Sequence, residues 1–133
     1  MTTINKKTVL LIVEDEVVLI NTLEKRLSSE GFEILRAMDG DEGLKLALSK
    51  HPDLILLDIL LPKVDGLTMF KKLREDSWGA HTPVVILTND NSSCNIAEAM
   101  KINKNCLFEY ILKANISLDD IVIRIKKRLN INN

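Results

Sequence analysis

Five short runs of apolar residues recur along the chain, and each is rich in leucine or β-branched side chains. Most of these residues are apolar in succession rather than in alternation, which is typical of strands buried on both faces of a parallel sheet. The pattern predicts strands at Val9–Val13, Phe32–Ala37, Leu54–Leu57, Val84–Leu87 and Tyr110–Leu112.

Between these runs the apolar positions follow a helical spacing. Leu19, Leu23 and Leu27 recur every fourth residue, so they line one face of a helix. The same reasoning predicts helices over residues 16–29, 41–50, 67–75, 93–102 and 118–129. Alternating strands and helices indicate right-handed crossovers, which place helices on both faces of one parallel sheet.

Three of these helices carry end signals. Gly31 follows the first helix as a C-terminal stop, and Pro52 ends the second because the residue before proline avoids the α region. Ser117 is placed to cap the last helix, and Asp119 and Asp120 in its first turn match the helix dipole.

The length of 133 residues allows one compact domain, since domains average about 150 residues. Apolar residues make up 46% of the chain and charged residues 28%, a balance typical of globular proteins. The net charge of −1 argues against a broad basic face for nucleic acid. We therefore expect a single domain over 1–133, with its core at about 8–129, short disordered ends and no direct contact with nucleic acid.

Neither a signal peptide nor a membrane span is expected. Lys6 and Lys7 precede an apolar stretch that stops at Glu14, short of a signal-peptide core, and no run approaches the roughly 18 apolar residues of a membrane helix. The sequence therefore indicates a cytoplasmic protein. Cys94 and Cys106 lack the short spacing of zinc ligands, so we expect ordinary thiols.

Acidic residues follow two of the predicted strands. Glu14, Asp15 and Glu16 come directly after the first strand, and Asp58 comes after the third. Carboxyl ends of parallel strands meet at one edge of the sheet, where ligands bind, so these carboxylates should converge. Carboxylates held that close repel one another unless a cation joins them, and a shallow oxygen site suits Mg²⁺. In the alternative reading, the first three only cap a helix and Asp58 is an N-cap or a solvated strand end.

Two further polar residues end strands. Thr88 closes the fourth strand and Lys113 closes the fifth. Beside the carboxylates they supply a hydroxyl group and a cation, which a phosphoryl group needs. Either residue could instead be structural, because a lysine at a strand end commonly extends to water.

Five motifs in order carry a resemblance to a known family. They are residues 11–16 (LIVEDE), 52–58 (PDLILLD), 61–66 (LPKVDG), 83–88 (PVVILT) and 110–113 (YILK). Together they resemble the receiver domain of bacterial two-component response regulators, over roughly Thr8 to Leu129. The resemblance implies a flavodoxin-like, doubly wound α/β fold with five (βα) units. Its parallel strands follow the order 2-1-3-4-5, and five helices flank them.

The resemblance also implies a phosphoryl-transfer site. Asp58 is the expected phosphoacceptor, and Glu14 and Asp15 form the acidic pocket beside it. Mg²⁺ is the expected cofactor, bound by these carboxylates and the backbone carbonyl of Leu60. Lys113 is expected to pair with the phosphoryl oxygens. An aspartate nucleophile assisted by a metal and a lysine agrees with the chemistry of phosphoryl transfer.

A signalling switch and its partners follow from the same resemblance. Thr88 is expected to turn toward the phosphoryl group, and the rotamer of Tyr110 to follow it. The surface of the fourth helix, fifth strand and fifth helix then reports the change to an unknown downstream protein. The phosphodonor is a phosphohistidine of a histidine kinase or phosphotransfer protein, docking near Asp58 and the first helix. A phosphorylation-linked dimer is a further possibility.

The sequence departs from the family pattern at three places, one of which is Cys106-Leu107 in place of the small Gly-Ala pair before the fifth strand. Asn89 and Asp90 follow Thr88 where the family has a small residue first, and Ala114 replaces the proline that usually follows the lysine. These departures keep open an atypical receiver that acts as a phosphorylation-independent interaction module. A magnesium-dependent phosphatase is disfavoured, because Asp58-Ile59-Leu60 lacks the second acid of its Asp-x-Asp motif. We therefore expect a signalling domain that catalyses only its own phosphorylation and dephosphorylation.

Overall fold

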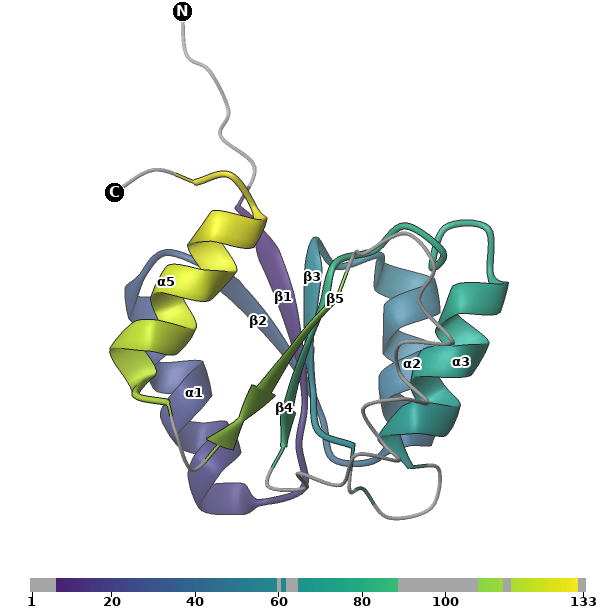
Figure 1. Cartoon of the computed structure of the whole chain (residues 1–133), viewed down its shortest axis with the longest axis horizontal. Coiled ribbons are helices and arrows are strands. Elements are labelled where there is room, and N and C mark those ends of the chain that lie inside the picture. The colour runs from purple at the N-terminus through teal and green to yellow at the C-terminus, as the bar shows by residue number, and fades with distance from the viewer. Residues whose placement is uncertain (1–6, 60, 62–64, 89–107, 114–115, 132–133) are drawn as a thin grey trace, which may run out of the picture.

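The computed structural model describes residues 7–59, 61, 65–88, 108–113 and 116–131, and its centre is a five-stranded parallel sheet (Figure 1). The strands are β1 (Val9–Val13), β2 (Glu33–Ala37), β3 (Leu54–Leu57), β4 (Val84–Thr88) and β5 (Phe108–Leu112). They lie in the order β2-β1-β3-β4-β5, and all four pairings are parallel. The expected doubly wound α/β fold and strand order are confirmed.

Helices cover both faces of this sheet. The described helices are α1 (Val17–Ser29), α2 (Gly40–Lys50), α3 (Gly66–Glu75) and α5 (Leu118–Arg128). Figure 1 shows α1 and α5 on one face and α2 and α3 on the other. The helix predicted at 93–102 lies outside the described residues. Among the helices that can be described, none has the length and apolar character needed to cross a bilayer.

The central strand β1 shows why the fold needs helices on both faces. Leu10 and Ile12 pack in the cluster under α1 and α5, whereas Leu11 and Val13 pack in the cluster under α2 and α3. All four side chains are fully buried. The unbroken apolar run therefore reflects burial on two faces, as predicted.

The predicted helix ends are largely confirmed. Gly31 takes a φ of +98°, and the Ser117 hydroxyl accepts a hydrogen bond from the Asp120 backbone N–H at 3.1 Å. His51 ends α2 in the left-handed region, with a φ of 48°. The first helix begins at Val17, one residue later than predicted.

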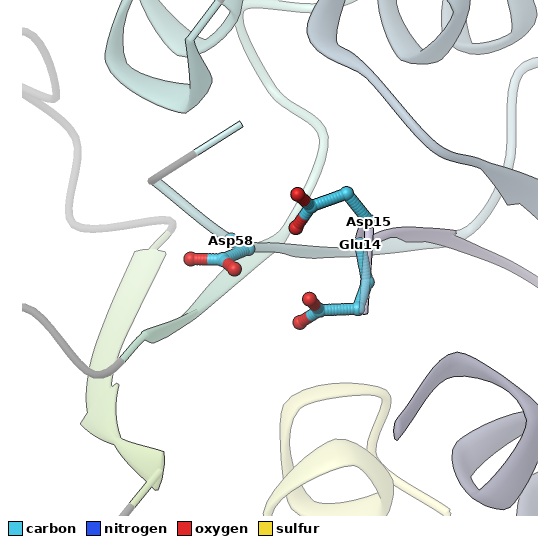
Figure 2. A group of neighbouring side chains, drawn as sticks. All are labelled: Glu14, Asp15 and Asp58. Atoms are coloured by element: carbon cyan, nitrogen blue, oxygen red, sulfur yellow. The ribbon is translucent and has the colours of Figure 1, made fainter. Parts of the chain in front are cut away.

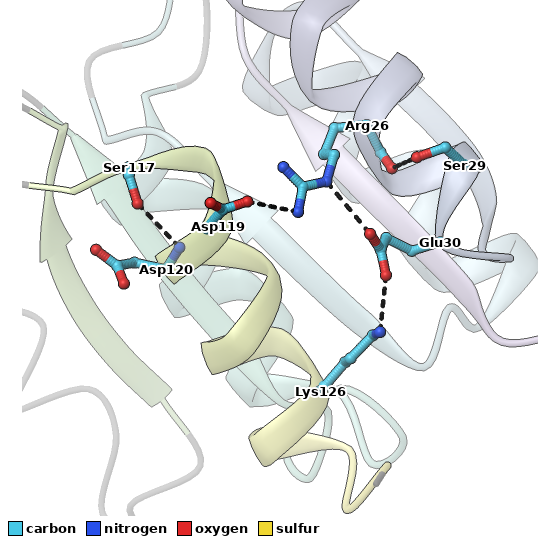
Figure 3. A network of polar contacts seen from close by, with 7 residues as sticks. All are labelled: Arg26, Ser29, Glu30, Ser117, Asp119, Asp120 and Lys126. Atoms are coloured by element: carbon cyan, nitrogen blue, oxygen red, sulfur yellow. Dashed lines mark hydrogen bonds and ion pairs between the residues drawn. The ribbon is translucent and has the colours of Figure 1, made fainter. Parts of the chain in front are cut away.

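A network of ion pairs joins α1 to α5 (Figure 3). Arg26 contacts Asp119 at 2.7 Å and Glu30 at 3.3 Å, and Lys126 contacts Glu30 at 2.7 Å. These four residues, called the interhelical network below, link the two helices that share one face of the sheet.

Candidate functional site

The strand register brings three charged residues to the carboxyl edge of the sheet. Val13 pairs with Leu57 at the ends of β1 and β3, and the next residues are Glu14 and Asp58. The Asp58 backbone N–H donates to the Val13 carbonyl at 3.0 Å, which fixes the two strand ends together. Lys113 directly follows β5 and reaches the same edge.

Glu14, Asp15 and Asp58 form an acidic cluster (Figure 2). One carboxylate oxygen from each lies within 4.8 Å of the others. Glu14 is 3% exposed and Asp58 is 5% exposed, whereas Asp15 is exposed to solvent. Glu14, Asp15 and Asp58 thus converge as expected, whereas Glu16 is not part of this group. Asp58 is not the solvated strand end of the alternative reading.

The ammonium group of Lys113 lies between two of these carboxylates. Its Nζ is 2.7 Å from Glu14 Oε1 and 3.1 Å from Asp58 Oδ2. A third carboxylate, that of Glu16, lies 3.9 Å away. Since the side chains of Lys113, Glu14 and Asp58 are 11%, 4% and 6% exposed, the ion pairs with Glu14 and Asp58 are shielded from bulk water.

Burial and charge shift the acid–base equilibria in opposite senses at this site. Burial raises the pKa of Glu14, and repulsion from Asp58 adds to this, although hydrogen bonds from Lys113 and the Glu16 backbone oppose it. Burial alone lowers the pKa of Lys113, but hydrogen bonds and attraction from Glu14 and Asp58 outweigh it, so the pKa is raised. The lysine is therefore firmly cationic.

The donor set fits a small divalent cation. Three carboxylates with oxygens within 4.8 Å of one another form the oxygen-rich, incompletely enclosed site that Mg²⁺ prefers. Two of the three are buried with one lysine to balance them, so the cluster carries excess negative charge. The predicted fourth ligand, the backbone carbonyl of Leu60, lies outside the described residues.

The two predicted switch residues occupy the strands nearest Lys113. Thr88 is the last residue of β4 and pairs with Leu112, the residue before Lys113. Tyr110 lies in β5, paired with Ile86. The side chains of Thr88 and Tyr110 are outside the part of the chain that the structure describes, so their switch role stays a prediction. The same holds for the departures at Asn89, Asp90 and Ala114.

Sequence reasoning missed Gly66, the first residue of α3. Its backbone N–H donates to the Ile59 carbonyl at 2.7 Å. A Cβ at this position would clash with the Asp58 carbonyl oxygen and would lie 2.6 Å from the Ile59 Cα. The glycine therefore lets α3 begin directly against the backbone of Asp58. The Asp65-Gly66 pair signals only a turn in the sequence and gives no hint of this contact.

Comparison with known proteins gives a consistent result over most of the chain. A model of the response regulator receiver domain family matches residues 10–126. The transcriptional regulatory protein DltR of Streptococcus agalactiae is 34% identical over 119 residues, covering 90% of this chain and 50% of that protein. The chain spans half or less of the length of such curated relatives, down to 17% for the response regulator PleD of Caulobacter vibrioides.

Solved structures show the same architecture. The phosphorylated cyanobacterial phytochrome response regulator RcpA is 30% identical, with a TM-score of 0.78 over 92% of this chain and 93% of that one. The receiver domain of the sensor histidine kinase PA1611 of Pseudomonas aeruginosa has a TM-score of 0.82 at 22% identity, covering 94% and 99% of the two chains. That structure holds a magnesium ion in its active-site cleft. With the family match spanning residues 10–126, this chain belongs to the response regulator receiver domain family.

Proposed function

We propose that this protein is a phosphorylation-dependent signalling switch that accepts a phosphoryl group on Asp58. The observation that carries the proposal is the position of Lys113, whose ammonium group contacts both Asp58 and Glu14 at the carboxyl edge of the sheet. A nucleophilic carboxylate beside a fixed cation is the arrangement that phosphoryl transfer requires.

In the proposed reaction, an Asp58 carboxylate oxygen forms a bond to phosphorus. The bond from phosphorus to the donor breaks, and for a phosphohistidine the imidazole nitrogen keeps the electron pair. Lys113 pairs with the phosphoryl oxygens and neutralises their charge. Glu14, Asp15 and Asp58, with the carbonyl of Leu60, would hold Mg²⁺, which when bound would supply further positive charge beside the transferred group.

The signalling step depends on the end of β4 and on β5. Lys113 directly follows β5, and Thr88 pairs with Leu112 beside it, so a group bound at Asp58 lies close to both strand ends. In the proposal, Thr88 turns toward the phosphoryl group and Tyr110 follows. The surface formed by the fourth helix, β5 and α5 then changes between two states.

The proposed partners are a histidine kinase or a phosphotransfer protein as donor, and a downstream protein as target. Several relatives are transcriptional regulators by name, and each is at least twice as long as the matched region. Any contact with nucleic acid is therefore assigned to a partner or to another domain. We further propose that residues 1–133 form one receiver domain, that it works in the cytoplasm, and that phosphorylation can promote a dimer.

Intact mass after incubation with acetyl phosphate and Mg²⁺ tests this function. We expect one added phosphoryl group in the wild type and none in Asp58→Asn or without the metal. Asp120→Asn, an exposed aspartate on α5, is the matched control and should be modified like the wild type. A folded wild type that gains no phosphoryl group would contradict the proposal. That outcome would favour the phosphorylation-independent interaction module. The departures from the family pattern at Asn89, Asp90 and Ala114 are consistent with such a module.

A further inference from the structure

Glu16 stands at the start of α1, but its side chain does not cap the helix. It occupies the N-cap position with an extended backbone and no hydrogen bond from its carboxylate to the first turn. Its backbone N–H donates to Glu14 Oε2 at 3.1 Å. The Glu16 carboxylate is therefore free of the structural role that an acid at this position usually has.

The carboxylate instead lies beside the functional lysine. Glu16 Oε1 is 3.9 Å from Lys113 Nζ, which is 3.1 Å from Asp58 Oδ2. Because both distances share the Lys113 nitrogen, the Glu16 and Asp58 oxygens lie within 7.0 Å of each other. The Glu16 side chain is 60% exposed, whereas that of Lys113 is 11% exposed. Glu16 thus lies on the solvent side of the lysine.

Both residues line one small pocket. It has a volume of about 270 Å³ and lies between the start of α1 and the start of α5. Apart from Thr22, its other lining residues are apolar, among them Leu87, Ile116 and Ile121. Within this lining, Glu16 is the negative group and Lys113 the positive group. Glu16 is also absent from the set of three carboxylates that suit a cation.

We propose that Glu16 is a specificity-determining residue that discriminates among phosphodonors by their charge, an inference that rests on the proposed function. A negative charge within 7.0 Å of Asp58 Oδ2 repels a donor approaching the Asp58 carboxylate in proportion to the donor's own negative charge. This separation is shorter than the Debye length of about 10 Å at 0.1 M salt, so the repulsion acts at moderate ionic strength. Small, strongly anionic donors are disfavoured relative to less negative ones.

Two small donors of different charge test this selection. Acetyl phosphate is more negative than phosphoramidate at neutral pH. Both transfer the same group: an Asp58 oxygen–phosphorus bond forms and the bond from phosphorus to the leaving group breaks. Acetate leaves from the first donor, and ammonia leaves from the second, whose nitrogen is already protonated at neutral pH. In Glu16→Gln we expect phosphorylation by acetyl phosphate to be about two- to fivefold faster at low salt, with a smaller gain for phosphoramidate. Both gains should disappear at about 1 M salt, where the Debye length is about 3 Å.

The matched control is Glu33→Gln. Glu33 is exposed and pairs with Val9 at the opposite edge of the sheet, so its loss should change neither rate. Equal acceleration with both donors, no acceleration, or a slower reaction in Glu16→Gln would overturn the proposal. A slower reaction with both donors would mean that Glu16 positions Lys113 instead.

Binding of inorganic phosphate provides a readout that needs no phosphoryl transfer. Titration followed by backbone amide NMR shifts should give about two- to fivefold tighter binding in Glu16→Gln than in wild type at low salt. Unchanged phosphate affinity would contradict the role of Glu16 even if Asp58 is phosphorylated. Tighter binding in a protein that accepts no phosphoryl group would support the charge effect while rejecting the proposed function.

Discussion

Two groups of ion pairs in this molecule use the same chemistry and differ in their access to water. At the carboxyl edge of the sheet, Lys113 contacts the buried Glu14 and Asp58. In the interhelical network, Arg26 and Lys126 contact Glu30, whose side chain is 25% exposed, between α1 and α5 (Figure 3). Burial raises the pKa of Glu14, whereas hydrogen bonds from Lys126 and Arg26 lower the pKa of Glu30.

The opposite shifts show what each group of charges is suited to. A glutamate whose ionised form is favoured by its partners stabilises the fold at neutral pH, where it is ionised. A glutamate whose ionised form is opposed by burial costs folding free energy, and its charge is better balanced by an added cation. The buried cluster is therefore poised to bind, whereas the network joins two helices.

The largest expected effect comes from removing the cation at the centre of the buried cluster. Lys113→Met should lower the free energy of unfolding by about 3 kcal/mol at neutral pH in the presence of EDTA, because Glu14 and Asp58 lose their shared counter-charge. Mg²⁺ should restore more stability to this variant than to wild type, since it replaces the missing positive charge. Urea denaturation with EDTA and with Mg²⁺ measures both effects.

Lys25→Met is the control for this substitution. Lys25 is an exposed lysine on α1, and its replacement should change the unfolding free energy little in either condition. A Lys113→Met variant as stable as wild type would mean that the cost of burying the lysine cancels its attraction to the two carboxylates. The buried cluster would then stabilise the fold no more than the interhelical network does.

A second prediction concerns the backbone that holds the buried cluster in place. Gly66→Ala puts a Cβ against the carbonyl of Asp58, so α3 must shift or the end of β3 must move. We expect a loss of about 2 kcal/mol in unfolding free energy and slower phosphorylation by acetyl phosphate. Thr68→Ala, an exposed position in the same helix, should leave both quantities near wild type. Normal phosphorylation with reduced stability would show that Asp58 tolerates displacement.

The sequence predicted the boundaries of the fully buried strands well, and those of the outer strand β5 less well. The boundaries of β1 and β3 match because unbroken apolar runs define them. The last strand was predicted to begin at Tyr110 because the charged Glu109 interrupts the apolar run, but β5 begins at Phe108 and includes Glu109. In the structure, Glu109 is accommodated by ion pairs to Arg124 at 2.7 Å and Arg128 at 3.2 Å from α5.

The sequence predicted which residues form the candidate site, but it did not predict which of them contact one another. Strand order alone places Glu14, Asp58 and Lys113 at one edge of the sheet. The sequence could not show that Lys113 bridges the two carboxylates, or that Gly66 abuts Asp58, because these contacts depend on the approach of segments distant in the chain. The sequence placed Glu16 either among the converging carboxylates or in a helix cap, and neither reading predicted its position beside Lys113.

A smaller effect is expected from the interhelical network. Arg26→Met removes contacts to Asp119 and Glu30 while keeping an apolar side chain. Ion pairs that remain partly exposed to water contribute less than buried ones, so the loss of unfolding free energy should be a small fraction of that in Lys113→Met. It should vanish in about 1 M NaCl, where the Debye length is about 3 Å. Urea denaturation at low and high salt, with Lys25→Met as control, checks this. A loss that persists at high salt would mean that the network is structural in the same way as the buried cluster.

The smallest expected effect is a pH dependence that separates the two regions by sign. The pKa of Glu30 lies below its usual value of 4.5, because Lys126 and Arg26 favour the ionised form in the folded state. Its contribution to stability is therefore complete above pH 4.5 and is lost as the pH falls through the lowered pKa. The stability difference between wild type and Glu30→Gln should be positive near neutral pH and shrink on acidification, as measured by urea denaturation across this range. Glu33→Gln should show no such trend. A stability difference that grows on acidification would contradict this prediction and would mean that Glu30 behaves like Glu14. The pKa of Glu14 is raised, so its folded state binds the proton more readily than the unfolded chain, and its contribution to stability increases as the pH falls.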